Sequence, residues 1–282
     1  MALIDRLHTL TTLITGNAGN SLWQATGFYF RTLTPPDAQG SRFPMDDYLV
    51  TNRHVIFDKS MGVEVLADNL IFALRYVDNT TKTIKWHQIS ISNADLKTRA
   101  FISSDPKVDV AVIKIGDLVQ NAINNNPNVM FGYNAVTEAD LPSQNKFDID
   151  VCDDTVVIGY PRGYYDTLNL FPIVKSGIIA SACNVLFQGL PLFLTDVKLY
   201  GGSSGSLVIT KPSYQAMVAG KPKAFPEKSF ALLGVYSGEP IYPRDPVQID
   251  EELTIIKKSS YNLGIVWYSF LIMDIINQSV HP

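Results

Sequence analysis

A glycine- and serine-rich turn, Tyr200 to Ser206, separates two apolar runs and holds the residue best suited to nucleophilic chemistry, Ser204. A serine hydroxyl attacks a carbonyl carbon when a neighbouring base removes its proton, and the resulting oxyanion needs preorganised N–H donors. Glycines at 202 and 205 allow a sharp turn that aims the amides of Gly202 and Ser204 into one oxyanion hole. A flexible surface turn has the same composition, so the rest of the chain must decide.

His54 is the histidine best placed to serve as the base. It follows the apolar run Tyr48-Leu49-Val50, so we expect it just past the end of a buried strand. That position is rigid yet faces an open edge, which suits a general base. The other histidines fit less well, on an N-terminal helix, in mid-strand and beside the C-terminus: His8, His87 and His281.

Asp109 stands between valines at the start of an apolar run, Val108 to Ile115. Burying a carboxylate costs several kcal/mol unless a partner compensates it, so Asp109 needs a partner. The alternative is an aspartate that caps a turn; Asp105 is a nearby competitor, but its Asp-Pro context indicates a turn. The order His54, Asp109, Ser204 predicts that base and acid lie on the first half of the chain and the nucleophile on the second.

Composition sets the broad class. The chain has 282 residues, 46% of them hydrophobic, enough for one large or two ordinary domains. Short β-branched and aromatic runs broken by 18 Gly and 16 Pro favour an all-β fold. The net charge of −4 is spread without a basic block, which argues against nucleic acid and anionic membranes as partners. No cofactor or metal is predicted, and Cys152 and Cys183 are expected to be buried free thiols.

The N-terminal residues suggest a helix rather than a targeting signal. Charged and polar side chains interrupt the apolar core that a signal peptide needs: Asp5, Arg6 and His8. No stretch approaches the roughly 20 apolar residues of a membrane span, so we expect a cytoplasmic protein. Leucine and isoleucine recur at helical spacing, which predicts an amphipathic helix over 2–15: Leu3, Leu7, Leu10 and Ile14. This helix would dock on the body or on a protein partner or regulator.

The remaining chain divides into segments by composition. We expect an N-terminal amphipathic helix within 1–20, a β-rich half over 21–116, a polar connector with one short helical part over 117–147, and a second β-rich half over 148–282. Within the second half, 211–229 reads as a lengthened exposed loop and 269–276 as a short C-terminal helix.

Several motifs together resemble the chymotrypsin-fold, or trypsin-like, serine peptidases, closest in style to the bacterial Deg-type and glutamyl-endopeptidase branches. The resemblance covers about residues 22–272. Ala25-Thr26-Gly27-Phe28 resembles the opening strand of that family, and Thr51-Asn52-Arg53-His54-Val55 resembles its histidine motif. The segment Val108 to Lys114 resembles the aspartate motif. Ile158 to Gly163 with Ser176 to Ser181 resembles the first hairpin of the second barrel, and Thr195-Asp196 stands where the family has such a pair before the serine.

The resemblance implies two six-stranded antiparallel β-barrels, 21–116 and 148–282, with short N- and C-terminal helices and the active site between the barrels. It also implies a serine endopeptidase that cleaves polypeptides through an acyl-enzyme. His54 would take the proton of Ser204, Asp109 would hold the imidazole, and the amides of Gly202 and Ser204 would bind the oxyanion. Ser203 departs from the family's digestive members, whose aspartate there pairs with a new N-terminus, so that activation switch is absent.

By the same resemblance, five residues would line the primary specificity pocket: Leu199, Tyr200, Tyr236, Ser237 and Gly238. Tyr236 stands where glutamate-specific members carry a histidine. Such a wall is apolar, so we expect an uncharged, apolar residue before the scissile bond. Lys198 would reverse this preference if its side chain pointed inward, which strand alternation leaves open.

Two other functions fit parts of the pattern. A catalytically quiet protease fold used for protein binding would not require all three reactive groups. An esterase of the α/β-hydrolase type would need Gly-x-Ser-x-Gly and the order Ser, Asp, His, and this chain has neither. A cytoplasmic peptidase must also be restrained, by narrow specificity or by a cleft that assembles only when something binds.

Overall fold

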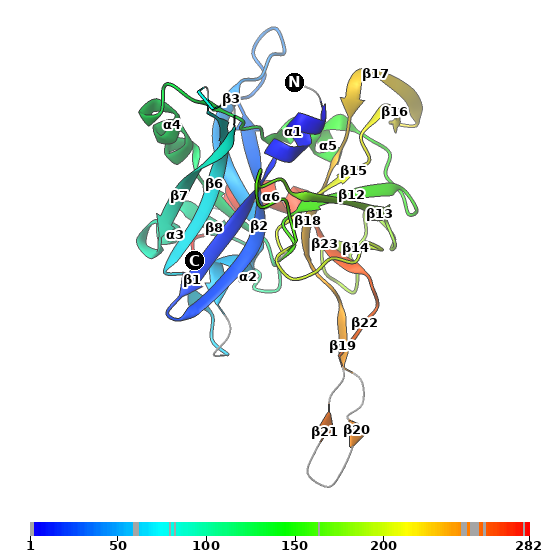
Figure 1. The fold of residues 1–282 in the computed structure, drawn as a ribbon. Helices are drawn as coiled ribbons and strands as arrows, with labels where there is room; N and C mark the ends of the chain where they lie inside the picture. The colour runs from blue at the N-terminus through cyan, green and yellow to red at the C-terminus, as the bar shows by residue number, and fades with distance from the viewer. Residues whose placement is uncertain are drawn as a thin grey trace.

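The computed structural model describes residues 3–58, 62–78, 80–81, 83–162, 164–243, 247–248, 254–255, 258–278 and 280–282. Strands predominate and form two β-rich halves that lie side by side, joined by a connector with helical turns (Figure 1). The all-β class expected from the sequence is confirmed.

The first half is built on one sheet in the order β10-β6-β1-β2-β3-β9-β8, with β11 beside β2 and β7 beside β6. Its nine strands are β1 (Thr11–Ala18), β2 (Ser21–Leu33), β3 (Pro44–Thr51), β6 (Asn69–Val77), β7 (Ile84–Ser92), β8 (Ala100–Ile102), β9 (Ala111–Lys114), β10 (Met130–Phe131) and β11 (Val136–Thr137). Strands β4 (Phe57–Asp58) and β5 (Val65–Leu66) pair separately, and α3 (Asn93–Arg99) links β7 to β8. This sheet exceeds the six strands expected.

The predicted helix over 2–15 is wrong beyond its first turns. The helix α1 covers only Leu3–Thr9, and the chain then enters β1, which pairs with β2 and β6. Leu10 and Ile14, four residues apart, fit one face of a helix but also the even alternation of a strand. The β-branched threonines at 11, 12 and 15 favour the strand. Residues 11–18 therefore belong to the first sheet and not to a separate N-terminal element.

The second half is a six-stranded sheet in the order β13-β12-β15-β18-β23-β14. Its strands are β12 (Asp154–Gly159), β13 (Ile173–Ile178), β14 (Leu192–Thr195), β15 (Leu207–Thr210), β18 (Leu232–Gly238) and β23 (Gly264–Tyr268). The two outer strands meet through a bridge between Ile179 and Thr195 and an Ala180 N–H to Leu194 O bond of 2.7 Å. These bonds close the sheet on itself.

Further hairpins extend from the second half (Figure 1): β16 (Ser213–Val218) with β17 (Lys221–Ser229), β19 (Ile241–Pro243) with β22 (Lys258–Ser260), and β20 (Val247–Gln248) with β21 (Thr254–Ile255). The first of these replaces the loop expected over 211–229. Its turn residues Ala219 and Gly220 have φ of 50° and 73°, the conformation of a tight hairpin turn. Its prolines are compatible with a strand because they lie on an exposed edge.

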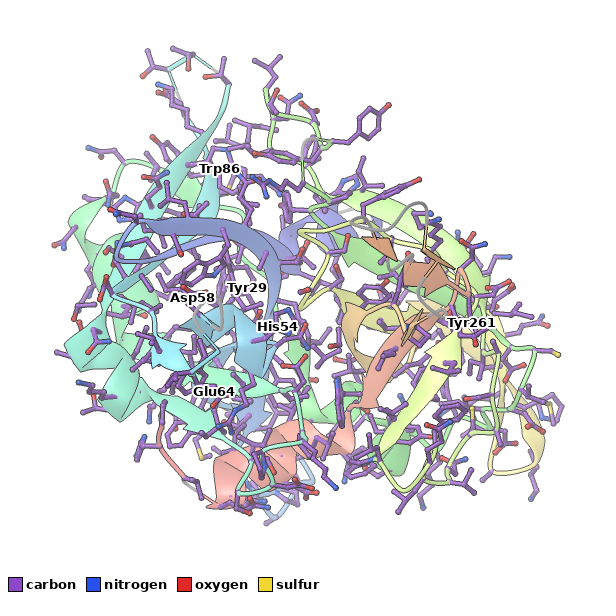
Figure 2. All side chains as sticks on the ribbon, turned by 90° about the horizontal axis from the view of Figure 1, so that it is seen from below. Tyr29, His54, Asp58, Glu64, Trp86 and Tyr261 are labelled. Carbon is purple, nitrogen blue, oxygen red and sulfur yellow. The ribbon has the colours of Figure 1, made fainter. Side chains whose placement is uncertain are left out.

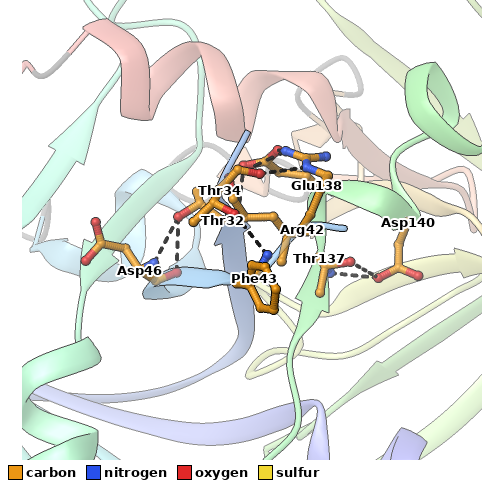
Figure 3. Close-up of polar contacts among 9 residues, drawn as sticks. Thr32, Thr34, Arg42, Phe43, Asp46, Thr137, Glu138 and Asp140 are labelled. Atoms are coloured by element: carbon orange, nitrogen blue, oxygen red, sulfur yellow. Dashed lines mark hydrogen bonds and ion pairs between the residues drawn. The ribbon is translucent and has the colours of Figure 1, made fainter. Parts of the chain in front are cut away.

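The connector contains three helical segments instead of one: α4 (Gly116–Asn125), the 3-10 turn η1 (Glu138–Asp140) and α5 (Pro142–Asn145). Figure 3 shows how η1 is tied to the end of the β2–β3 hairpin. The Glu138 carboxylate accepts the Leu33 N–H at 3.1 Å and pairs with Arg42. The turn is closed locally by Asp140, whose carboxylate accepts the Thr137 N–H at 2.7 Å. The connector is therefore fixed to the first half through η1.

A large hydrophobic cluster fills the space where the halves meet. It joins Phe28 and Val50 of the first half to Ile158 and Leu207 of the second. Helix α6 (Phe270–Gln278) is the expected C-terminal helix and adds Leu271, Ile272 and Ile275 to the cluster. Leu7 of α1 packs against the same cluster, so α1 docks on the body.

The cysteines differ from the expectation in their burial. Both are free thiols, but Cys152 is exposed and Cys183 is half-buried. Cys152 lies in the turn just before β12, where its φ is 72°. Within the described residues, no helix is both long and apolar enough to cross a bilayer.

Candidate active site

His54 and Asp109 meet because their strands are neighbours. Strands β3 and β9 are antiparallel, with Thr51 opposite Ala111, so the residue after β3 and the residue before β9 lie at the same sheet end. His54 sits in the one-turn helix α2 (Arg53–Ile56), and Asp109 lies two residues before β9. Their side chains bond through Nδ1 and Oδ2 at 2.7 Å.

The Asp109 carboxylate accepts hydrogen bonds from both halves. Besides the imidazole, Oδ1 accepts the His54 N–H at 2.9 Å, and the Ser237 hydroxyl donates to Oδ2 at 2.5 Å. The backbone of Asp109 is also anchored, because the Asn52 side-chain amide donates to the Asp109 carbonyl oxygen at 2.7 Å. The His54–Asp109 bond favours a proton on Nδ1, which leaves Nε2 free to accept one. This is the tautomer that a general base needs.

The turn that carries Ser204 requires two glycines. Gly202 and Gly205 have φ of +91° and +83°, a region that side chains with a Cβ disfavour. A Cβ on Gly205 would lie 2.0 Å from Thr26 O, and one on Gly202 would lie 2.6 Å from Arg162 N. The turn is thus held against the first half on one side and against residues 160–162 on the other.

The amides of Gly202 and Ser204 are oriented by the carbonyls that precede them. Gly201 O accepts the Arg162 N–H at 2.6 Å, and Ser203 O accepts the Ser206 N–H at 3.0 Å. No peptide bond of the described chain is cis, so the N–H that follows each carbonyl points the opposite way. The two N–H groups face away from these partners, and neither donates to a protein acceptor among the described residues.

The Ser204 hydroxyl lies in the same cavity as His54 but donates to the Ser237 carbonyl, with an oxygen–oxygen distance of 3.0 Å. In this arrangement its proton is not directed at the imidazole. Hydrogen bonds of this kind often tighten only when substrate binds. Ser237 therefore contacts both the acid, through its hydroxyl, and the serine, through its carbonyl.

A cavity of about 450 Å3 opens where the halves meet and is lined by residues 21–25, Val55, Phe57, Asp58, His54 and Ser204. Figure 2 shows His54 near the boundary between the two halves. A larger cavity, about 680 Å3, lies elsewhere, between the connector, residues 183–186 and the start of α6. It contains neither His54 nor Ser204, so its size does not make it the reactive site.

The five residues expected around the specificity pocket have different environments. Leu199 and Tyr236 are buried in the core of the second half, whereas Tyr200 is 67% exposed. Ser237 turns its hydroxyl to Asp109, and Gly238 has open space where a Cβ would be. Lys198, whose direction the sequence left open, donates its ammonium to Asn262 Oδ1 at 2.9 Å.

Burial raises the pKa of the Tyr236 hydroxyl, and the nearby Glu239 carboxylate raises it further. The phenol therefore stays neutral at physiological pH.

Thr26 has a role that the sequence did not reveal. It is fully buried, and its N–H donates to Ser204 O at 2.8 Å while its hydroxyl donates to Gly202 O at 3.0 Å. The same hydroxyl accepts the Tyr160 N–H at 2.8 Å. Its position in the Ala25-Thr26-Gly27-Phe28 segment was the available signal, but only the fold places it against the serine turn.

In the described part of the chain, no three His, Cys, Asp or Glu side chains are arranged to hold a metal ion.

Comparison with known proteins assigns the chain to a family. Residues 25–219 match the family model of the trypsin-like peptidase domain. Among solved structures, the chain is similar to the protease Anisep from Arthrobacter nicotinovorans, with a TM-score of 0.51, 14% identity and coverage of 96% of this chain and 95% of that one. It is also similar to a scabies mite inactivated protease paralogue, S-I1, with a TM-score of 0.49, 12% identity and 97% of each chain covered.

No curated protein sequence matches the chain. The similarity to the solved structures, at these identities, concerns the fold. The family match extends over more than half of the sequence and includes His54, Asp109 and Ser204. The chain belongs to the trypsin-like peptidase family and is a trypsin-like serine endopeptidase.

Proposed function

We propose that this endopeptidase cleaves polypeptides through an acyl-enzyme formed on Ser204, with His54 as general base and acid and Asp109 as the group that orients His54. The observation that carries the proposal is the Asp109 carboxylate bonded to His54 Nδ1 at 2.7 Å in the cavity that also contains Ser204. Ser204 Oγ attacks the substrate carbonyl while Nε2 takes its proton. The amides of Gly202 and Ser204 bind the oxyanion, and His54 then protonates the leaving amine.

Before attack, the Ser204 hydroxyl must leave the Ser237 carbonyl and turn toward His54. In this proposal the change is a rotation about the Cα–Cβ bond of Ser204, within the cavity that His54 and Ser204 both line. We propose that this rotation of the Ser204 hydroxyl is the step that restrains peptide hydrolysis. A substrate that fits the cleft displaces the resting hydrogen bond, whereas a poorly fitting one does not. Hydrolysis of generic casein as fast as the best library peptide would contradict such restraint.

An uncharged, apolar residue before the scissile bond fits the proposed pocket. We assign its wall to Leu199 and Tyr236, which are buried in one cluster of the second half and of which the Tyr236 hydroxyl stays neutral. Lys198 is engaged with Asn262, so its ammonium is partly satisfied before substrate binds. Cleavage-site profiling on a peptide library tests this preference. Apolar residues at this position are expected, and a dominant acidic or basic preference would refute the pocket assignment.

The direct test of the mechanism is Ser204→Ala, with Ser203→Ala as a matched control in the same turn. Ser203 is buried and its hydroxyl has no hydrogen-bond partner among the described residues, so its removal should cost little. Ser204→Ala should keep the wild-type melting temperature and lower kcat by about four or more orders of magnitude. Retained turnover in purified Ser204→Ala would reject the nucleophile.

A further inference from the structure

Arg75 is a buried cation in the first half, outside the reactive site. Its side chain comes from β6, and the residue is 6% exposed. A buried guanidinium must be compensated, and Arg75 has no carboxylate within ion-pair distance in the described structure. It is compensated by neutral groups instead. The guanidinium lies 5.2 Å from the ring centre of Trp86, labelled in Figure 2, and 4.7 Å from that of Phe171.

The hydrogen bonds of Arg75 join three separate parts of the chain. One nitrogen donates to His8 O, in the last turn of α1, at 2.7 Å. Another donates to Tyr160 Oη at 3.2 Å and Leu170 O at 3.1 Å, both in the segment between β12 and β13. Carbonyls at a helix C-terminus favour a cation, so the His8 contact is stabilising. The His8 ring also lies against Phe171, with ring centres 4.7 Å apart.

The segment that Arg75 holds is the one that supports the serine turn. Tyr160 is fully buried, and its hydroxyl also donates to Leu170 O at 3.0 Å. Its backbone N–H donates to Thr26 Oγ1, which in turn donates to Gly202 O. Two residues later, the Arg162 N–H donates to Gly201 O at 2.6 Å. That last bond sets the direction of the Gly202 amide.

We propose that Arg75 is a positioning residue for the oxyanion hole: by clamping Tyr160 and Leu170 to the first half and to the end of α1, it fixes the backbone of residues 160–162 and thereby the Gly202 amide. This role rests on the proposed function of Ser204 and Gly202. Helix α1 then contributes indirectly to catalysis, because the His8 carbonyl is one of the acceptors that keep Arg75 in place.

The test compares Arg75→Met with Arg31→Met as a matched control. Arg31 is also an arginine of the first sheet beside an aromatic ring, with its guanidinium 5.7 Å from the Tyr133 ring centre, but its side-chain hydrogen bonds in the described structure go to Asp47 and not to the segment between β12 and β13. Arg75→Met should lower kcat about 10- to 100-fold with little change in KM, below the 10²–10³ loss for a directly removed oxyanion donor. Arg31→Met should leave kcat unchanged.

Inhibitor affinity separates positioning from general damage. A peptide aldehyde forms a tetrahedral adduct whose oxygen occupies the oxyanion hole, whereas the matching peptide alcohol makes only the other contacts. Arg75→Met should weaken the aldehyde by the same factor as kcat and leave the alcohol nearly unchanged. If Arg75→Met does not fold, Tyr160→Phe removes only the hydroxyl to which Arg75 donates. This variant should also weaken the aldehyde relative to the alcohol, by a smaller factor. An aldehyde-to-alcohol ratio equal to wild type would overturn the proposal.

Hydrogen exchange tests the role of Arg75 without requiring enzymatic turnover. In a Ser204→Ala background, Arg75→Met should speed amide exchange in peptides covering 157–172 and 198–206, and Arg31→Met should not. If the wild type hydrolyses peptides but exchange and inhibitor ratio are unchanged, the role of Arg75 fails and the proposed function stands. If the wild type does not hydrolyse peptides, the proposed function fails, and the exchange result alone decides whether Arg75 holds the turn.

Discussion

At the scale of single residues, the carboxylate of Asp109 shows how the site depends on both halves. Two of its donors come from His54 and the third, the Ser237 hydroxyl, comes from β18 of the other half. An imidazole bonded to this carboxylate is held in one orientation only while the carboxylate itself is fixed. Ser237 is therefore expected to contribute to the alignment of His54.

Ser237→Ala tests this contribution. Loss of a hydrogen bond to a charged group costs about 1.5–3 kcal/mol, so kcat should fall by about 10- to 150-fold, with KM nearly unchanged. The Ser237 carbonyl remains, so the resting contact of Ser204 is not altered. Steady-state kinetics on the best library peptide measures the effect. A variant with wild-type kcat would show that two donors suffice to hold Asp109.

Cys183 gives a prediction on pH. Burial raises the pKa of its thiol to about 11, and Asp150 and Asp153 add to the rise because their negative charges disfavour a thiolate. At pH 8 about one molecule in a thousand carries the thiolate, the reactive form. In a Cys152→Ser background, iodoacetamide should therefore react with Cys183 at least about 100-fold more slowly than with free cysteine. The rate should rise about tenfold per pH unit up to pH 10; alkylation as fast as that of free cysteine would contradict the burial.

Residue types and motif spacing predicted His54, Asp109 and Ser204 as a set, because the three signals are weak singly and specific together. The structure brings His54 and Asp109 within hydrogen-bond distance and lines one cavity with His54 and Ser204. Residue types and spacing could not reveal Thr26 or Arg75. Threonine and arginine are ordinary residues in a strand, and their roles come from contacts across more than 80 residues of sequence. Such long-range pairings have no local signal.

At the scale of elements, the serine turn depends on glycine for two separable reasons. Gly205 has a positive φ, and it also has Thr26 O where a Cβ would stand. Gly220, in the β16–β17 turn, has a similar φ of +73° but open space around it. Comparing the two isolates the effect of the close approach.

Gly220→Ala should cost about 1 kcal/mol in the free energy of unfolding, the cost of the left-handed conformation alone. Gly205→Ala should cost clearly more, because either the turn or Thr26 must move, and it should lower kcat at least about tenfold. Thermal melting and kinetics of both variants provide the comparison. Equal losses in the two would show that contact with Thr26 does not constrain the turn.

The elements that the sequence misassigned share one cause. Leu10 and Ile14 are compatible with two periodicities, and the strand forms because β2 and β6 offer open edges on both sides. Residues 213–229 contain glycine and prolines that usually indicate a loop, yet the hairpin is completed by pairing between its own strands. The sequence pattern is compatible with more than one structure, and pairing with neighbouring strands decides which one forms.

At the scale of the whole molecule, the halves should unfold together. The largest hydrophobic cluster contains residues from both, and it includes α6 from the far end of the chain. Removing one half would expose this shared core to water, at a cost of about 25 cal/mol per Å2 of apolar surface. Calorimetry should show one transition with equal calorimetric and van't Hoff enthalpies. Two resolved transitions would mean that each half is stable without the other.

The central claim is that Ser204 is a nucleophile activated by His54, and active-site labelling measures it directly. A fluorophosphonate reacts rapidly only with an activated serine. Intact-mass and peptide mapping should place a single label on Ser204 in the wild type and none in Ser204→Ala. Labelling of His54→Ala should be slower by orders of magnitude. A wild-type protein that stays unlabelled, or that is labelled at the same rate without His54, would contradict the account.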